Sequence, residues 1–243
     1  GDSLYMFIGM PGYDNGKGAI AVSKYNTIQD RWDGFATAVF SDGTNGDMIG
    51  TAVGENIGRE INVSSDGKRI VTNVDTLDNT ARSRVYEYNS SQQVWQVVNE
   101  TISVDTSGLS SSTPTVGGVA IDSDGDFTAL GYLTLASGAA VSAFGTVSSS
   151  SSATLLQTLG TTGLSAAMSE DGTRVVTHSG EVYDELNGTY TLATTIPFDL
   201  SGQPAGTTLD DVINHVIISG DGRTVVAEYW QSGGHSITRV QYN

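Results

Sequence analysis

The three histidines, His178, His215 and His235, are the side chains of this 243-residue chain best suited to bind a metal. They show no His-x-His or His-x₃-His spacing, so a metal site would require the fold to bring them together. Serine and aspartate are abundant, but no G-x-S-x-G segment singles out a nucleophile. Cysteine is absent, which excludes thiolate ligands, cysteine nucleophiles and disulfides. These observations predict a protein that is not an enzyme and has no cofactor.

The composition is strongly acidic, with 11 Lys and Arg residues against 27 Asp and Glu residues and a formal net charge of −16. Such a surface repels phosphate groups, so we expect neither nucleic acid nor an anionic membrane as a partner. No apolar run approaches the roughly 18–20 residues of a membrane-spanning helix, and no charged-then-apolar leader is present. Because the first residue is Gly1, we expect a processed product or a fragment of a longer chain.

Strand signals occur along the whole chain and helix signals are almost missing. Short runs of Val, Ile, Tyr, Phe and Thr are separated by Asn-Gly, Asp-Gly and Ser-rich turns, and 30 glycines interrupt every candidate helix. The sequence therefore predicts an all-β protein.

An Asp-Gly corner recurs at Asp66, Asp124, Asp171 and Asp221, with intervals of 58, 47 and 50 residues. This is the length of one β-propeller blade. We expect each Asp-Gly pair to form a two-residue type I′ hairpin turn, which needs positive φ, and we interpret the aspartates as structural. The predicted fold is a single β-propeller domain of about five four-stranded blades, at approximately 1–45, 46–105, 106–160, 161–205 and 206–243.

Four strands, A to D, can be assigned in each of the three middle units. They are 58–64, 69–75, 83–89 and 94–102, then 117–122, 127–134, 140–147 and 153–159, then 164–169, 174–179, 181–186 and 189–196. The first unit has only strands B to D, at 4–10, 18–26 and 31–40. The last has only strands A to C, at 214–220, 224–230 and 236–243. The first and last blades are therefore predicted to be incomplete.

Both ends carry strands B and C, so the two termini do not complete each other. Three explanations stay open. The chain is part of a longer one, or another copy donates the missing strands in a head-to-tail assembly or filament, or the ring is irregular with short end blades.

The segment FIGMPGYDNGKGAIAVSKYN (7–26) resembles the FG-GAP repeat of integrin α-subunit propellers. The matching positions are Ile8, Gly9, Met10, Pro11, Gly16, Gly18, Ala19 and Val22. The resemblance covers residues 4–102 and fades afterwards, and integrin-like propellers have seven repeats where this chain shows five. It implies an extracellular or cell-surface protein of the cell-adhesion kind.

Some FG-GAP members bind calcium at the corner between strands A and B. Here only the DSDGD segment, with Asp122, Asp124 and Asp126, comes close to that oxygen-rich loop. The distal ligand falls near Leu130, which cannot coordinate a cation. The resemblance thus leaves calcium as the only metal expectation, with an ordinary turn as the alternative.

Four Asn-x-Ser/Thr sequons occur, at Asn62, Asn89, Asn99 and Asn187. We expect glycosylation at Asn89 first, and also at Asn187 and Asn99, whereas Asn62 on an inner strand is expected to be inaccessible. Trp230 has no counterpart in the other units and is the candidate for a ligand or partner surface.

Together the sequence predicts a non-catalytic, extracellular or cell-surface structural and interaction protein, a glycoprotein whose partners are proteins, including copies of itself. A glycan-binding propeller is the second prediction, and glycans are then the partners. A propeller hydrolase is the third. All three depend on fold analogy, since propellers carry many functions.

Overall fold

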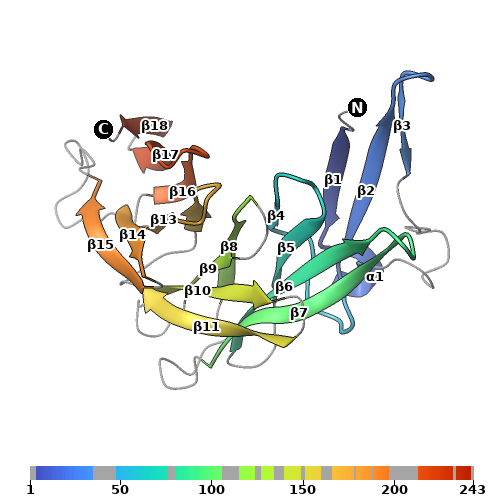
Figure 1. Ribbon diagram of the computed structural model, residues 1–243, viewed down its shortest axis with the longest axis horizontal. Coiled ribbons are helices and arrows are strands. Elements are labelled where there is room, and N and C mark those ends of the chain that lie inside the picture. Colours follow the sequence, from blue (N-terminus) through green and yellow to red (C-terminus); the bar gives the residue numbers. More distant parts are fainter. Residues whose placement is uncertain are drawn as a thin grey trace.

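The computed structural model contains five antiparallel β-sheets that follow one another in chain order along an arc (Figure 1). The described strands do not close the arc into a ring (Figure 1). The structure describes residues 4–34, 48–75, 80–105, 115–123, 127–133, 140–148, 151–159, 166–177, 179–187, 189–196, 213–231 and 234–241.

The three middle sheets have four strands each, in the orders β4-β5-β6-β7, β11-β10-β9-β8 and β12-β13-β14-β15. Their bounds are β4 (Ile61–Val63), β5 (Arg69–Val74), β6 (Thr80–Asn89), β7 (Val94–Asp105), β8 (Thr115–Ile121), β9 (Phe127–Leu133), β10 (Ala140–Ser148), β11 (Ser151–Leu159), β12 (Ala166–Met168), β13 (Arg174–Thr177), β14 (Glu181–Leu186) and β15 (Thr189–Thr195).

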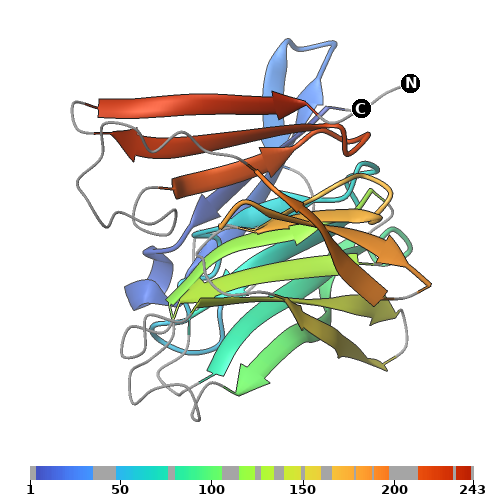
Figure 2. The ribbon, with the colours of Figure 1, turned by 90° about the vertical axis from the view of Figure 1, so that its left-hand side faces the viewer.

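The first and last sheets have three strands each, in the orders β1-β2-β3 and β16-β17-β18. Their bounds are β1 (Tyr5–Met10), β2 (Ala19–Asn26), β3 (Arg31–Gly34), β16 (Ile213–Ile218), β17 (Thr224–Gln231) and β18 (Gly234–Gln241). Figure 2 shows the three strands of the last sheet, in red, side by side as one layer. A single helical turn, α1 (Tyr13–Gly16), lies between β1 and β2.

Every one of these strands overlaps a strand predicted from the sequence, and the predicted all-β fold of antiparallel, four-stranded sheets is confirmed. The agreement has a local cause. Alternating apolar residues and Asp-Gly corners fix where each strand begins and ends, without reference to the rest of the chain.

The corner between the first two strands of a unit is a loop of five residues, 64–68 in the second sheet. In the second sheet, the Ser64 amide donates to the Arg69 carbonyl (2.9 Å), and the Gly67 amide donates to the Ser64 carbonyl (2.9 Å). Gly67 has a φ of +69°, whereas Asp66 is not among the residues with positive φ. The predicted two-residue type I′ turn is therefore wrong, because that turn requires positive φ at both central residues.

The corner aspartates close these loops by accepting hydrogen bonds. Asp66 Oδ1 accepts from the Ser64 hydroxyl (2.9 Å) and from the Lys68 amide (2.9 Å). The same pattern recurs at the corners around Asp171 and Asp221. These aspartates have the structural role that the sequence predicted.

A chain of backbone hydrogen bonds joins the corners of neighbouring sheets. The Ser65 amide donates to the Ser123 carbonyl (2.9 Å), the Ser123 amide to the Glu170 carbonyl (2.7 Å), and the Glu170 amide to the Gly220 carbonyl (2.9 Å). We call these four residues the corner belt. It holds the last four sheets together at the ends of their innermost strands.

The hydrophobic core lies between the sheets. One cluster joins the fourth and fifth sheets, and a second joins the third and fourth. A third joins the first and second sheets and includes Ile20, Val22, Ile70, Tyr86 and Trp95. This face-to-face packing leaves the innermost strands β4, β8, β12 and β16 beside one another.

Candidate functional site

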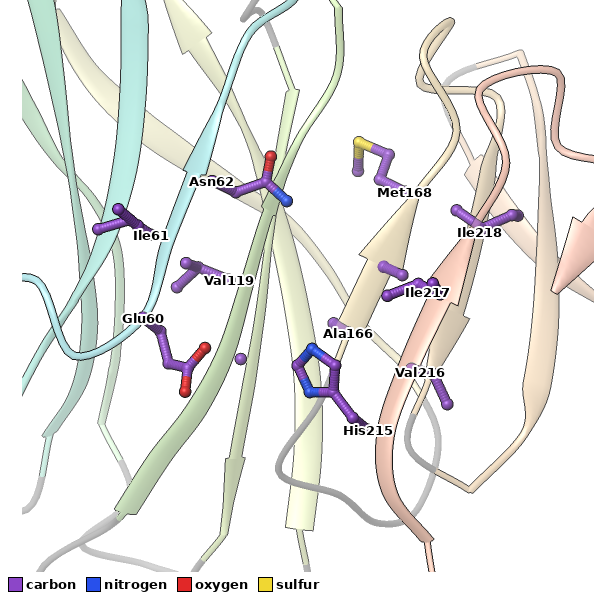
Figure 3. A pocket seen from close by; sticks show the side chains of 12 residues that line it. Glu60, Ile61, Asn62, Val119, Ala166, Met168, His215, Val216, Ile217 and Ile218 are labelled. Carbon is purple, nitrogen blue, oxygen red and sulfur yellow. The ribbon is translucent and has the colours of Figure 1, made fainter. Parts of the chain in front are cut away.

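A cavity of about 160 Å³ lies among the innermost strands of the last four sheets. We call it the axial pocket. Its polar side chains include Glu60, Asn62 and His215, and its walls are mostly apolar or small, including Val119, Ala166, Met168, Val216 and Ile217 (Figure 3). A pocket with few polar groups on a largely apolar wall is the usual form of a small-molecule site.

Glu60 and His215 occupy the same place in two different repeats. Each precedes by four residues the serine of its corner, Ser64 in the second sheet and Ser219 in the fifth. The third sheet has Gly118 at this place, counted back from Asp122. A shared repeat position gives the two side chains the same orientation toward the axial pocket, where they point toward one another (Figure 3).

The backbone of Glu60 is held by two fully buried side chains of β5. The Glu60 amide donates to Asn73 Oδ1 (2.8 Å), and the Thr72 hydroxyl donates to the Glu60 carbonyl (2.8 Å). Asn73 is itself fixed, because its Nδ2 donates to Asp75 (3.3 Å). These contacts give Glu60 a defined position just before β4 begins.

Burial raises the pKa of the Glu60 carboxyl group above its ordinary value, and the positive charges of His215 and Arg59 oppose this shift without reversing it. Arg59 is also paired with Asp75 (2.7 Å). A carboxyl group with a raised pKa that faces an imidazole is an arrangement that general acid–base catalysis can use.

From the sequence we expected no role for Glu60, and we weighed His215 only as a metal ligand. The signal that could have found the pair is their shared position, four residues before the corner serine, on strands expected at the centre of the propeller. Within the described part of the chain, no group of three or more His, Cys, Asp and Glu residues could hold a metal ion. His178 lies outside the described residues, and His235 lies in β18 with an undescribed side chain.

Of the predicted calcium ligands, Asp122 is buried at the end of β8, with 2% of its surface exposed. Asp124 and Asp126 lie outside the described residues, so the calcium expectation stays a prediction. At the corners around Asp66, Asp171 and Asp221, hydrogen bonds to the aspartate close the loop, as described above.

Of the predicted glycosylation residues, Asn187 is exposed in the turn after β14, and Asn89 is partly exposed at the end of β6. Asn99 lies in β7 and Trp230 in β17, and neither side chain is among those described. Asn62 is exposed to the axial pocket, so its predicted inaccessibility is wrong. Glycosylation and the Trp230 surface stay predictions.

Solved structures similar to this chain are propeller proteins. The periplasmic gluconolactonase of Pseudomonas aeruginosa matches with a TM-score of 0.56 and 14% identity, over 99% of this chain and 68% of that one. A Bacteroides uniformis protein assigned as a 6-phosphogluconolactonase matches with a TM-score of 0.44 and 13% identity, over 100% of this chain and 80% of that one. A protein assigned as TolB from Agrobacterium tumefaciens matches with a TM-score of 0.42 and 16% identity, over 75% of this chain and 57% of that one.

The likeness to the gluconolactonase, at 14% identity, bears on the fold alone and supports a β-propeller, while the number of blades stays a prediction. No family model matches the sequence, and no curated protein matches it. The β-propeller prediction is therefore supported, but membership of the FG-GAP family is not, and neither are the adhesion, filament and cell-surface expectations that accompanied it.

The first functional prediction is contradicted. We expected a non-catalytic structural and interaction protein, but a similar solved structure is a named gluconolactonase, and in the axial pocket a carboxyl group and an imidazole face each other. The prediction that the chain is not an enzyme is contradicted on the same ground. That prediction depended on motifs of consecutive residues, and such motifs do not reveal which residues of different blades lie close together in the fold.

No helix among the described residues has the length and apolar character needed to cross a membrane. The predicted protein partners, including copies of this chain, stay predictions.

Proposed function

We propose that this chain is a propeller hydrolase that opens lactone rings in the axial pocket. The observation that carries the proposal is the pair formed by Glu60 and His215, which face each other from the same repeat position of two sheets (Figure 3). The propeller fold shared with a periplasmic gluconolactonase supports the choice of lactones as substrates. The same likeness accords with the predicted location outside the cytoplasm, which we retain as part of the proposal.

In the proposed reaction, Glu60 acts as general base and His215 as general acid. A water molecule gives one proton to the Glu60 carboxylate as its oxygen bonds to the lactone carbonyl carbon. The bond between that carbon and the ring oxygen then breaks, and the protonated His215 imidazole donates a proton to the departing oxygen. The product is an open-chain hydroxy acid, and the two side chains regain their starting states by proton exchange with solvent.

The substitution Glu60→Gln tests the proposal, because it keeps the shape of the side chain and removes the base. We expect kcat/KM for glucono-1,5-lactone to fall by about 100-fold or more, the usual range for loss of a general base. His215→Asn is expected to cost about 100-fold for the same reason. The measurement is proton release in a pH-stat, with the uncatalysed opening of the lactone subtracted.

Glu87→Gln is the matched control. Glu87 lies on β6, outside the axial pocket, and pairs with Arg69 at 3.4 Å with 40% of its side chain exposed. We expect this variant to hydrolyse the lactone like the wild type. The proposal is wrong if the wild type does not exceed the uncatalysed rate with any of a panel of five- and six-membered lactones, or if Glu60→Gln is fully active.

A further inference from the structure

A second cavity, of about 240 Å³, lies at the corner-belt end of the innermost strands. It is lined by all four residues of the corner belt, Ser65, Ser123, Glu170 and Gly220, and by Asp122. It shares Asn62, Met168 and Ile218 with the axial pocket. The two cavities therefore adjoin along β4, β8, β12 and β16, with Glu60 and His215 toward one end and the corner belt at the other, and we call them together the passage.

The charges along this passage are almost all negative. Glu60 lies in the axial pocket, and Asp122 and Glu170 line the corner-belt cavity. Among the described residues that line either cavity there is no lysine or arginine, and His215 is the single basic side chain. The lining is negatively charged, as is the whole chain, whose formal net charge is −16.

The position of Glu170 is built into the corner belt. A Cβ atom added to Gly220 would lie 2.3 Å from Glu170 Cδ and 2.5 Å from its Oε1, so the glutamate carboxyl group occupies the space that a side chain at position 220 would fill. The Glu170 backbone is fixed on both sides, since its amide donates to Gly220 and its carbonyl accepts from Ser123. The carboxyl group is thus directed over the neighbouring sheet at the mouth of the passage.

We propose that this passage selects uncharged lactones and rejects phosphorylated ones. The inference rests on the proposed function and adds the charge class of its substrate. A phosphate group carries about two negative charges, and a cavity lined by carboxylates repels it more strongly than open water does, because the protein walls lower the local dielectric constant. An uncharged sugar lactone meets no such barrier, and its hydroxyl groups can donate to the same carboxylates.

The test compares glucono-1,5-lactone with 6-phosphogluconolactone at low ionic strength. We expect kcat/KM to be at least about 100-fold higher for the uncharged lactone, and the preference to shrink as salt is added, since salt screens charge repulsion. Glu170→Gln should raise kcat/KM for the phosphorylated lactone relative to the uncharged one by about threefold to tenfold. Glu87→Gln removes a carboxylate outside the passage and should leave the ratio unchanged.

Binding of unreactive product analogues separates this inference from the proposed function. Gluconamide, in which an uncharged amide replaces the carboxyl group of the product, and its 6-phosphate can be titrated into the protein and followed by NMR line broadening. Binding of the uncharged amide alone, without hydrolysis of either lactone, would refute the hydrolase and support the charge selection. Equal hydrolysis of both lactones, or binding of the phosphorylated amide equal to that of the uncharged one, would overturn the selection while leaving hydrolysis intact. Failure to bind or hydrolyse any of these compounds would overturn both.

Discussion

Glu60 is placed where its charged form is disfavoured. Burial raises the pKa of its carboxyl group, while its backbone is held by Asn73 and Thr72. A residue that served only stability would gain from being neutral at this place, because a partly buried charge costs free energy. A shift in this direction accords with the role proposed above, since perturbed pKa values cluster at functional sites.

The effect of the charged Glu60 carboxylate on the free energy of unfolding can be tested with Glu60→Gln. A carboxyl group whose pKa is raised by folding favours the folded state below its unfolded pKa, and that contribution is lost as the pH rises through the folded pKa. We therefore expect the variant to match the wild type at pH 4 and to have an equal or higher free energy of unfolding at pH 7. Urea denaturation at the two pH values is the measurement. A variant that is less stable at pH 7 would show that the Glu60 carboxylate is a structural group.

The pH dependence of hydrolysis is a second consequence of the same residue. Glu60 must be deprotonated to accept a proton from water, so activity should rise with pH through its pKa. The midpoint of that rise should lie above the ordinary glutamate value of 4.5. Initial rates measured from pH 4 to 8 check this. The rise should be absent from the residual activity of Glu60→Gln, and a midpoint at or below 4.5 would contradict the assignment.

At the scale of the elements, the corner determines where the first strand of a unit ends and the second begins. In the fourth sheet, Asp171 Oδ1 accepts from the Ser169 hydroxyl (2.7 Å) and the Thr173 amide (3.0 Å). Burial works against the ionised form of Asp171, but the hydrogen bonds from Ser169 and Thr173 outweigh it, and the pKa of the carboxyl group is lowered. The corner is thus built around a charged acceptor.

Removing this acceptor with Asp171→Ala should lower the free energy of unfolding by about 1 kcal/mol at pH 7, a modest amount because the corner is exposed. Asp171→Asn retains an acceptor and should lose less. A lowered folded pKa stabilises the protein above the unfolded pKa of about 4, and the stabilisation is lost as the pH falls through the folded value. The difference between wild type and Asp171→Ala should therefore shrink in acid, as measured by denaturation at pH 7 and pH 3. A difference that persists at pH 3 would point to lost packing.

At the scale of the whole molecule, the first sheet joins the second through a close approach of backbones. A Cβ atom added to Gly9 would lie 1.8 Å from the Gly58 carbonyl oxygen. The neighbouring Gly18 forms a parallel bridge with Ile57. No side chain fits between these segments, so the junction requires glycine at position 9.

Gly9→Ala should therefore destabilise the protein by about 1–3 kcal/mol or more, the usual cost of forcing extra atoms into a packed site. Gly12→Ala is the matched control, because Gly12 has helical φ and ψ (−81°, −2°) and an added Cβ would meet nothing within 4 Å. Thermal unfolding of both variants is the measurement. Equal melting temperatures for the two would show that the first sheet does not depend on this contact.

The sequence alone was sufficient to locate the strands and the structural aspartates. Alternating apolar residues and the recurring Asp-Gly pairs are local signals, and each acts over fewer than about ten residues. The sequence did not predict the type of turn at these corners. The Ser64 hydroxyl donates to Asp66 and accepts from the Arg69 amide, and so closes a longer loop than the Asp-Gly pair alone suggests.

Only the tertiary structure decided the site. Glu60 and His215 lie in different sheets and far apart in the chain, and each is unremarkable within its own strand. They line one pocket because the sheets pack face to face and align equivalent repeat positions. Strand formation depends on neighbours in sequence, whereas the site depends on how whole sheets stack, which no short segment encodes.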